Sequence, residues 1–315
     1  MNKKLLALFG VTAGAAALTL HTYLDIMYKE TIPKGPMKRL QEAMDNGDMD
    51  ALGKYTDKSN EWNRKQKCEN IDLTNKRGEV LKGYFYPAEN ESKLFCVFAH
   101  GYRADHNGDP ANFIRYYHEK GYNFFSCDHT AAGRSDGDFV GFDYFESQDM
   151  LEWLDYLIGR FGEDIKIVLH GVSMGGATVC KMADKVPEQV KIIVADCPYT
   201  SAQDEFIAVA KSVGINKTAP AIFKGFNELN KWIAHYDLLE TDVRDNVKNS
   251  KVPMLFVHGA DDDFVPTRMG VELCDICRND KDIYLVANAK HAESIVKDTE
   301  GYLNKLSEFI DKYVD

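Results

Sequence analysis

The chain has 315 residues, 44% of them hydrophobic and 28% charged, which is enough for one large globular domain or one domain with an insertion. Its formal net charge is −11, and no stripe of clustered lysine and arginine occurs along it. Nucleic acid is therefore excluded as a partner, because phosphate binding requires such clusters. The acidity indicates a self-repelling, soluble surface instead.

The N-terminal residues form an apolar run. Lys3 and Lys4 precede an uncharged stretch from residue 5 to residue 20, which continues as "HTYL". This pattern is typical of a signal peptide or a short membrane anchor over residues 1–24, and an uncleaved anchor is favoured because no sharp cleavage site stands out. We therefore expect a membrane-anchored or secreted protein that associates with a membrane through residues 5–24. Basic residues flank both ends of the run, so the side of the membrane stays open.

The next part of the chain is polar. Residues 25–68 predict a linker that becomes helical and packs on the main domain. From residue 69 the pattern changes: "ENIDLTN" and "VLKGYFYP" alternate as in a β-hairpin that turns at "NKRG". We place the start of the catalytic domain, residues 69–315, at this change.

Short apolar runs then alternate with longer amphipathic stretches. The runs are "LFCVFAH", "NFFSCD", "IKIVLHG", "VKIIVADC", "VPMLFVHG" and "DIYLVANA". Continuous apolar strands separated by helices predict an α/β fold with a mostly parallel central sheet and helices on both faces. Residues 201–250 are too long for one crossover helix and contain several aromatic residues, so they predict a helical insertion, a lid, before the last two strands.

The seven cysteines do not form a recognisable framework. Their number is odd and most lie in apolar runs, which indicates small buried side chains rather than disulfides. Cys274 and Cys277 form a C-x-x-C without a second pair or a suitably spaced histidine, so we expect neither a zinc site nor a redox site there.

A serine between glycines follows one of the strands. Residues 171–175 read G-V-S-M-G, after "IKIVLHG" and before a helix-like stretch. The glycines suit a strained strand-to-helix turn that exposes Ser173 as a nucleophile, although the bare pattern alone is also compatible with an ordinary tight turn.

Two other strand-end loops supply partners for this serine. A serine hydroxyl needs a base, and His291 follows the last strand. The base needs a carboxylate, and "HGADDDFVP" offers three aspartates after another strand. In an open parallel sheet these loops meet at the carboxyl ends of the strands. Taken singly, each of these residues is equally explained as part of a solvated loop.

Residues 69–315 resemble the α/β-hydrolase superfamily through "HGY", "DHTAAGRSDG", "GVSMGG", "HGADDDFVP" and "KHAES". The resemblance selects Asp262 as the acid, with Asp196 as the alternative. It implies an oxyanion hole from the main-chain N–H groups of Tyr102 and Met174. The loop "DHTAAGRSDG" departs from the usual D-x-R-G-x-G-x-S, and His100 is expected to brace its own loop.

The resemblance implies a serine hydrolase that cleaves carboxylic esters through an acyl-enzyme, with Ser173, Asp262 and His291 as triad. It implies no metal and no organic cofactor. The expected partner is a small-molecule or lipid-like ester. The open alternatives are an amidase or peptidase, a thioesterase or a lipase on the same triad, and a non-catalytic binding protein with the same fold.

Overall fold

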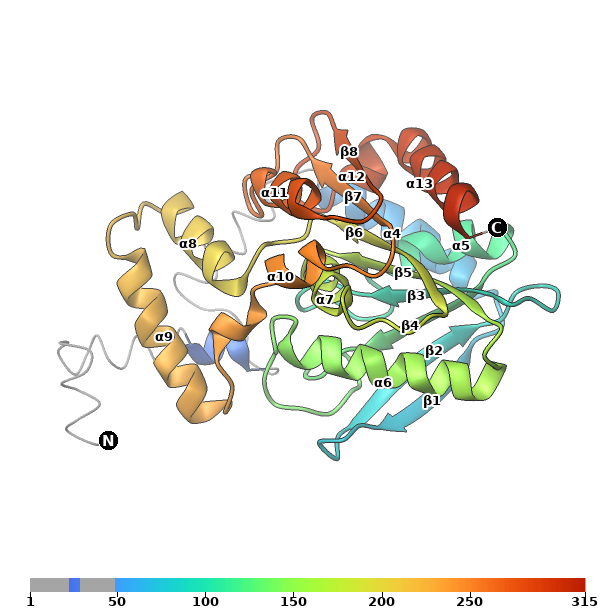
Figure 1. Cartoon of the computed structure of the whole chain (residues 1–315), viewed down its shortest axis with the longest axis horizontal. Coiled ribbons are helices and arrows are strands. Elements are labelled where there is room, and N and C mark those ends of the chain that lie inside the picture. The colour runs from blue at the N-terminus through green and yellow to red at the C-terminus, as the bar shows by residue number, and fades with distance from the viewer. Residues whose placement is uncertain (1–22, 29–48, 315) are drawn as a thin grey trace.

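The computed structural model describes residues 23–28 and 49–314. These residues contain one eight-stranded sheet with the order β1-β2-β4-β3-β5-β6-β7-β8 (Figure 1). Strand β2 pairs antiparallel with β1 and β4, and every other neighbouring pair is parallel. The strands are β1 (Glu69–Thr74), β2 (Val80–Tyr86), β3 (Leu94–Ala99), β4 (Asn123–Asp128), β5 (Lys166–Val172), β6 (Val190–Asp196), β7 (Met254–Gly259) and β8 (Lys281–Val286).

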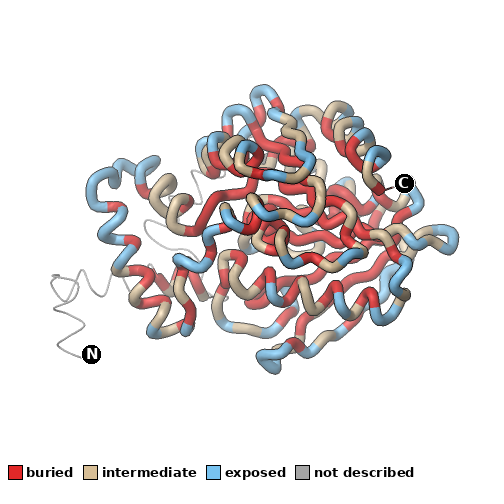
Figure 2. Tube along the Cα trace, viewed as in Figure 1, coloured by how far each residue is buried: buried red, intermediate tan, exposed pale blue. Residues whose placement is uncertain are grey.

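Helices cover both faces of this sheet, as the continuous apolar strands require. They are α4 (Met49–Asn63), α5 (Ala111–Glu119), α6 (Tyr144–Phe161), α7 (Met174–Met182), α11 (Arg268–Ile276), α12 (Ser294–Lys297) and α13 (Thr299–Tyr313). Trp153 of α6 and Leu273 of α11 belong to the core on one face. Tyr117 of α5 and Tyr302 of α13 belong to the core on the other. Figure 2 shows the strands as the buried centre between these layers. The predicted α/β-hydrolase fold is thus confirmed.

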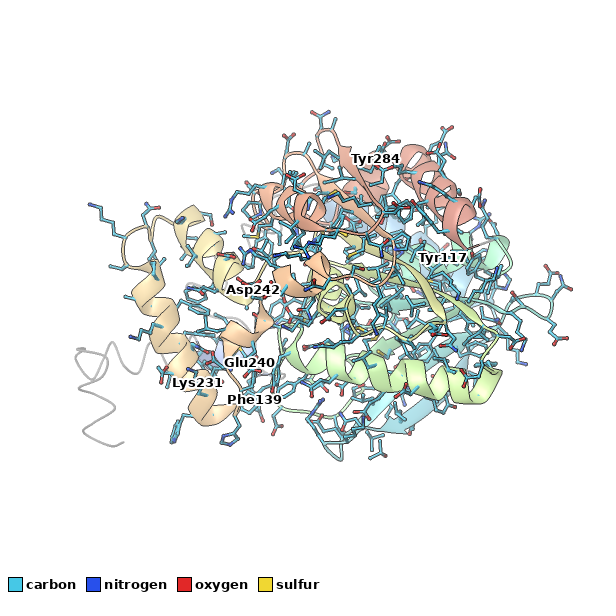
Figure 3. The ribbon with its side chains drawn as sticks, viewed as in Figure 1. Tyr117, Phe139, Lys231, Glu240, Asp242 and Tyr284 are labelled. Atoms are coloured by element: carbon cyan, nitrogen blue, oxygen red, sulfur yellow. The ribbon has the colours of Figure 1, made fainter. Side chains whose placement is uncertain are left out.

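The long interval between β6 and β7 is helical. It contains α8 (Ala202–Ser212), α9 (Ala219–Ile233), the 3-10 helix η1 (Leu238–Thr241) and α10 (Arg244–Lys248). Helices α8 and α9 stand beside the sheet at one end of the molecule (Figure 1). Lys181 of α7 donates hydrogen bonds to the carbonyl oxygens of Glu240 and Asp242, both labelled in Figure 3. The insertion is therefore tied directly to the helix that follows Ser173.

The predicted localisation, membrane-anchored or secreted through the N-terminal hydrophobic segment, is wrong. Within the two described stretches, no helix combines the length and the apolar character needed to cross a bilayer. Residues 1–22 lie outside the described residues. Tyr23, at the end of this run, belongs to the folded protein. It is fully buried, donates a hydrogen bond of 3.1 Å to Asn230 and packs against the ring of Phe226.

Candidate active site

Ser173 occupies the turn between β5 and α7. Its φ is +58° and its ψ is −119°, a backbone conformation that is rare for a residue with a side chain. The neighbouring glycines make this turn sterically feasible: a Cβ at Gly171 would overlap the carbonyl oxygen of Gly175, and a Cβ at Gly175 would overlap that of Ala99. The main-chain N–H of Ser173 donates to the carbonyl oxygen of Asp196, which fixes the turn against β6.

The structure brings the three sequence-predicted side chains together at the carboxyl ends of the strands. Ser173 Oγ lies 2.8 Å from His291 Nε2, and His291 Nδ1 lies 2.9 Å from Asp262 Oδ2. The serine comes from the β5–α7 turn, the carboxylate from the loop after β7 and the imidazole from the loop after β8. These distances form a continuous hydrogen-bonded chain from hydroxyl to carboxylate.

Of the three neighbouring aspartates, only Asp262 faces inward. It is buried, whereas Asp261 and Asp263 are exposed. Its second oxygen, Oδ1, accepts hydrogen bonds from the N–H groups of Phe264 and Val265, both at 3.0 Å. The carboxylate is therefore held from two sides.

The electrostatic environment keeps Asp262 ionised. Burial alone would raise its pKa, but the charge of His291 and the hydrogen bonds from His258 and His291 lower the pKa to about 2. His258 Nε2 lies 3.3 Å from Asp262 Oδ2 and 2.9 Å from the carbonyl oxygen of Val265. The sequence analysis quoted His258 within "HGADDDFVP", but no contact with the acid could be inferred for it there.

His291 responds in the opposite direction. Burial would lower its pKa, but the negative charge of Asp262 outweighs this and raises the pKa. Cys197, a further neighbour that the sequence did not single out, offers a sulfur within 4.8 Å of the ligand atoms of His291 and Asp262. Burial raises the pKa of Cys197 to about 12, so its thiol stays protonated at neutral pH. A protonated thiol and an imidazole already bonded to a carboxylate suit proton transfer better than metal binding.

Asp196, the alternative acid, has another place. It ends β6 with its side chain buried, and burial raises its pKa to about 7. The Nδ1 atom of His291 is taken by Asp262. Asp196 therefore contributes its main-chain carbonyl, which accepts from Ser173, rather than a carboxylate partner for the histidine.

The two main-chain N–H groups predicted to form the oxyanion hole belong to Met174 and Tyr102. Met174 begins α7 directly after Ser173, and Tyr102 follows β3. Neither N–H donates a hydrogen bond to any residue that the structure describes. At Met174 the positive end of the helix dipole adds to the attraction for an anion.

The loop that carries Tyr102 is braced by buried polar groups. His100 is fully buried, with Nδ1 at 2.7 Å from the carbonyl oxygen of Gly101 and Nε2 accepting from the N–H of His129. This is the bracing position expected for it. The carboxylate of Asp109, which the sequence did not indicate, accepts a 2.8 Å hydrogen bond from the N–H of Gly101.

Residues 23–28 also hold this loop. The hydroxyl of Tyr102 donates to the carbonyl oxygen of Ile26, and the guanidinium of Arg103 donates to that of Asp25. The side chain of Ile26 lines the pocket beside Ser173. A segment that the sequence assigned to the end of an anchor and the start of a linker is thus a wall of the site.

A pocket of about 110 Å³ opens beside Ser173. Its walls come from the loop after β3, from α8 and α9, and from the loop after β7. They are almost entirely apolar and carry several aromatic rings, as a site for an apolar group requires. The lining includes Phe142, Tyr199, Phe206, Phe223, Phe226 and Phe264.

Comparisons with known proteins agree with this architecture. A family model described as serine aminopeptidase, S33, matches residues 90–236, just under half of the chain. The uncharacterised protein YqkD of Bacillus subtilis (strain 168) is 25% identical over 242 residues, which cover 76% of this chain and 77% of that protein. The uncharacterised protein YfhR of Escherichia coli (strain K12) is 22% identical over 258 residues, 77% of this chain and 80% of that protein.

Solved structures share the fold at low sequence identity. The Pyrococcus furiosus esterase Pf2001 superposes with a TM-score of 0.64 at 19% identity, over 80% of this chain and 93% of that one. Est1E from Butyrivibrio proteoclasticus, solved with ferulic acid, gives 0.58 at 17% identity, over 78% and 99%. The Pyrococcus horikoshii acylaminoacyl peptidase gives 0.56 at 15% identity, over 77% of this chain and 40% of that one. With this sheet and the strand-turn-helix at Ser173, the chain has the α/β-hydrolase fold, and its residues 90–236 match the serine aminopeptidase family model.

Proposed function

We propose that this hydrolase cleaves carboxylic esters through an acyl-enzyme intermediate, with Ser173 as nucleophile, His291 as base and Asp262 as the acid of the triad. The observation that carries the proposal is the unbroken contact chain of 2.8 Å from Ser173 Oγ to His291 Nε2 and 2.9 Å from His291 Nδ1 to Asp262. A nucleophile, a base and a group that orients the base at these distances are the requirements of serine catalysis.

In the first half of the reaction, Ser173 attacks the ester carbonyl while its proton passes to His291 Nε2. Asp262 accepts the Nδ1–H of His291, which leaves Nε2 free as the acceptor, and its charge stabilises the imidazolium that forms. The imidazolium then gives its proton to the leaving alkoxide, so that an alcohol departs and the acyl group stays on Ser173 Oγ.

In the second half, water repeats the sequence. His291 removes a proton from the water, the hydroxide attacks the acyl carbon, and the proton returns to Ser173 Oγ as the carboxylic acid leaves. Both halves place negative charge on the former carbonyl oxygen. The unpaired N–H groups of Tyr102 and Met174 are the donors that we assign to this oxyanion.

The apolar pocket supports an ester with an apolar acyl group, because its wall offers little to a charged or strongly polar one. The esterases among the structural neighbours also support ester cleavage.

An amide is the second candidate substrate. The matching family model is described as serine aminopeptidase, and one neighbour is an acylaminoacyl peptidase. The same triad attacks an amide carbonyl by the same steps, with an amine in place of the alcohol as leaving group.

The test compares the full-length protein with Ser173→Ala on a panel of 4-nitrophenyl esters from acetate to long-chain acyl groups, beside an aminoacyl 4-nitroanilide. We expect ester turnover in the wild type and a loss of about 10³-fold or more in the variant, with an unchanged melting temperature. Labelling by a fluorophosphonate should occur in the wild type and disappear with Ser173. Turnover retained by the variant would overturn the assignment of Ser173 as nucleophile. A wild type that neither turns over ester nor takes the label would favour a non-catalytic binding protein.

A further inference from the structure

A single carboxyl group interrupts the apolar wall of the pocket. Glu205 lies on α8 and lines the same pocket as Ser173. Its side chain belongs to a residue that is only 8% exposed, and neither carboxyl oxygen has a hydrogen-bond partner among the residues that the structure describes. Leaving a buried polar group unpaired costs about 1–3 kcal/mol, so a carboxyl that no described residue pairs at this place is a contact point for a bound ligand.

The surroundings of Glu205 define the rest of that partner. Its neighbours in the pocket wall are aromatic and aliphatic, including Phe206, Phe223 and Phe226. Arg103 is the one basic residue in this lining, and its guanidinium is engaged with the carbonyl oxygen of Asp25 rather than with Glu205. A ligand must therefore be apolar where it touches the rings and polar only where it meets the carboxyl group.

The charge state of Glu205 decides which polar group fits. Burial raises its pKa to about 8; His291 and Arg268 act to lower it, and Asp262 and Asp204 act to raise it further. Near neutral pH the group is therefore mostly the neutral acid, which both donates and accepts a hydrogen bond. A neutral hydroxyl matches this pair of roles.

A cationic ligand fits less well. Its charge would have to leave water for an apolar pocket, and the attraction to one carboxylate does not reliably repay that cost. It would also lie near His291, which becomes positively charged during the reaction, and the repulsion would raise the barrier. Arg103 at the same wall adds to this repulsion.

We propose that the pocket selects acyl groups that are apolar along their length and carry one neutral hydroxyl, which forms hydrogen bonds with Glu205. This inference rests on the proposed function, because it assigns the acyl group of the ester that Ser173 attacks. Glu205 is a specificity-determining residue in this assignment and takes no part in bond making.

The test uses 4-nitrophenyl esters of 3-phenylpropanoic acid with a 3-hydroxyl, a 4-hydroxyl, a 4-methyl or a 4-aminomethyl group on the ring. The ring-methylated compound matches the ring-hydroxylated one in size but cannot form its hydrogen bonds. In the wild type we expect kcat/KM of the better ring-hydroxylated compound to exceed that of the ring-methylated compound about tenfold or more, because a site built to bind a hydroxyl discriminates strongly against its absence.

Two substitutions separate hydrogen bonding from charge. Glu205→Leu should reduce the hydroxyl-to-methyl ratio to about one or less, because the pocket becomes wholly apolar. Glu205→Gln should keep most of the ratio, because an amide still donates and accepts without a charge. The control Gln203→Leu changes a residue on the same helix that does not line the pocket, and it should leave the ratio unchanged.

Three results would overturn the inference. The first is a wild-type preference for the ring-methylated or ring-aminomethylated compound. The others are a hydroxyl-to-methyl ratio of kcat/KM that Glu205→Leu leaves intact, or one that Gln203→Leu abolishes equally. These results differ from a failure of the proposed function. In that case the wild type takes no fluorophosphonate label or Ser173→Ala still turns over ester, whereas here labelling persists and only the choice of acyl group departs from expectation.

Discussion

The phenolic oxygen of Tyr102 lies 2.6 Å from the main-chain carbonyl oxygen of Ile26. This hydrogen bond joins the loop after β3 to a segment that precedes the sheet by more than forty residues. The N–H that we assign to the oxyanion hole belongs to the same Tyr102, so the position of this donor depends on the N-terminal segment.

Removing that bond should therefore slow the reaction. Tyr102→Phe keeps the ring and deletes the hydroxyl, and we expect kcat for 4-nitrophenyl acetate to fall about 2- to 10-fold, the range of one hydrogen bond. Tyr116→Phe is the matched control, because it removes a hydroxyl bonded to Ser307 between α5 and α13. Equal effects of both variants would mean that the bond stabilises the protein without positioning the loop.

The acid of the triad should control both the rate and its pH dependence. Asp262→Asn removes the charge that raises the pKa of His291, so kcat should fall about 10³- to 10⁴-fold and the acid limb of the kcat/KM profile should move to lower pH. The exposed neighbour Asp261, changed to Asn, should alter neither quantity. An acid limb that stays in place in Asp262→Asn would argue against Asp262 as the partner of His291.

Gly175, two residues after Ser173, should tolerate no side chain. A Cβ at Gly175 would overlap the carbonyl oxygen of Ala99, so Gly175→Ala should cost several kcal/mol of unfolding free energy, about 3 or more, or prevent folding. Gly159 lies inside α6 with open space around it, and Gly159→Ala should stabilise the protein by about 0.5–1 kcal/mol. Chemical denaturation of both variants measures the contrast, which a similar loss at the two positions would contradict.

The buried carboxyl of the pocket should also affect stability. The pKa of Glu205 rises from 4.5 to about 8 on folding. Its contribution to the free energy of unfolding is therefore complete below pH 4.5 and is lost as the pH rises through 8. Glu205→Gln does not titrate, so its free energy of unfolding relative to wild type should increase by about 2–5 kcal/mol between pH 5 and pH 8.5. Melting temperatures measured across this pH range report the change. The exposed Glu308, changed to Gln, should show no such trend. A constant difference for Glu205→Gln would show that this carboxyl is not buried in its neutral form.

The sheet could be predicted because its strands are apolar on both faces. The six runs from "LFCVFAH" to "DIYLVANA" coincide with β3 to β8. Strands β3 to β7 are buried almost throughout because helices cover both faces, whereas the edge strand β8 is only partly buried. The hairpin at "NKRG" coincides with β1 and β2 for a local reason, the alternation of its two arms. The boundaries proposed for the domains stay predictions.

The candidate site could be predicted where neighbouring residues in the sequence indicate an unusual backbone conformation or match a known motif. Ser173 lies among glycines that the turn requires. The resemblance to the α/β-hydrolase superfamily selected Asp262 from three aspartates, of which it alone is buried. Glu205 gave no such sign, because a glutamate in an amphipathic helix is ordinarily solvated and only the packing of α8 against the pocket buries it. His258 lies inside an apolar strand, and nothing local reveals that it contacts Asp262.

The N-terminal segment was misjudged for a similar reason. The apolar run before Tyr23 is the strongest compositional pattern in the chain, but residues 1–22 lie outside the described residues, and composition alone did not indicate the contacts of the segment that follows. Tyr23 and Met27 are fully buried against the insertion and its surroundings. Their burial depends on contacts with residues about two hundred positions away, which no local pattern records.

The proposed nucleophile and base lie on loops at the carboxyl ends of the strands, whereas α8, α9 and Ile26, which line much of the pocket beside them, contribute no strand. Substitutions in α8 and α9 could therefore alter the shape of the pocket while the strands and the loops at their ends keep their positions.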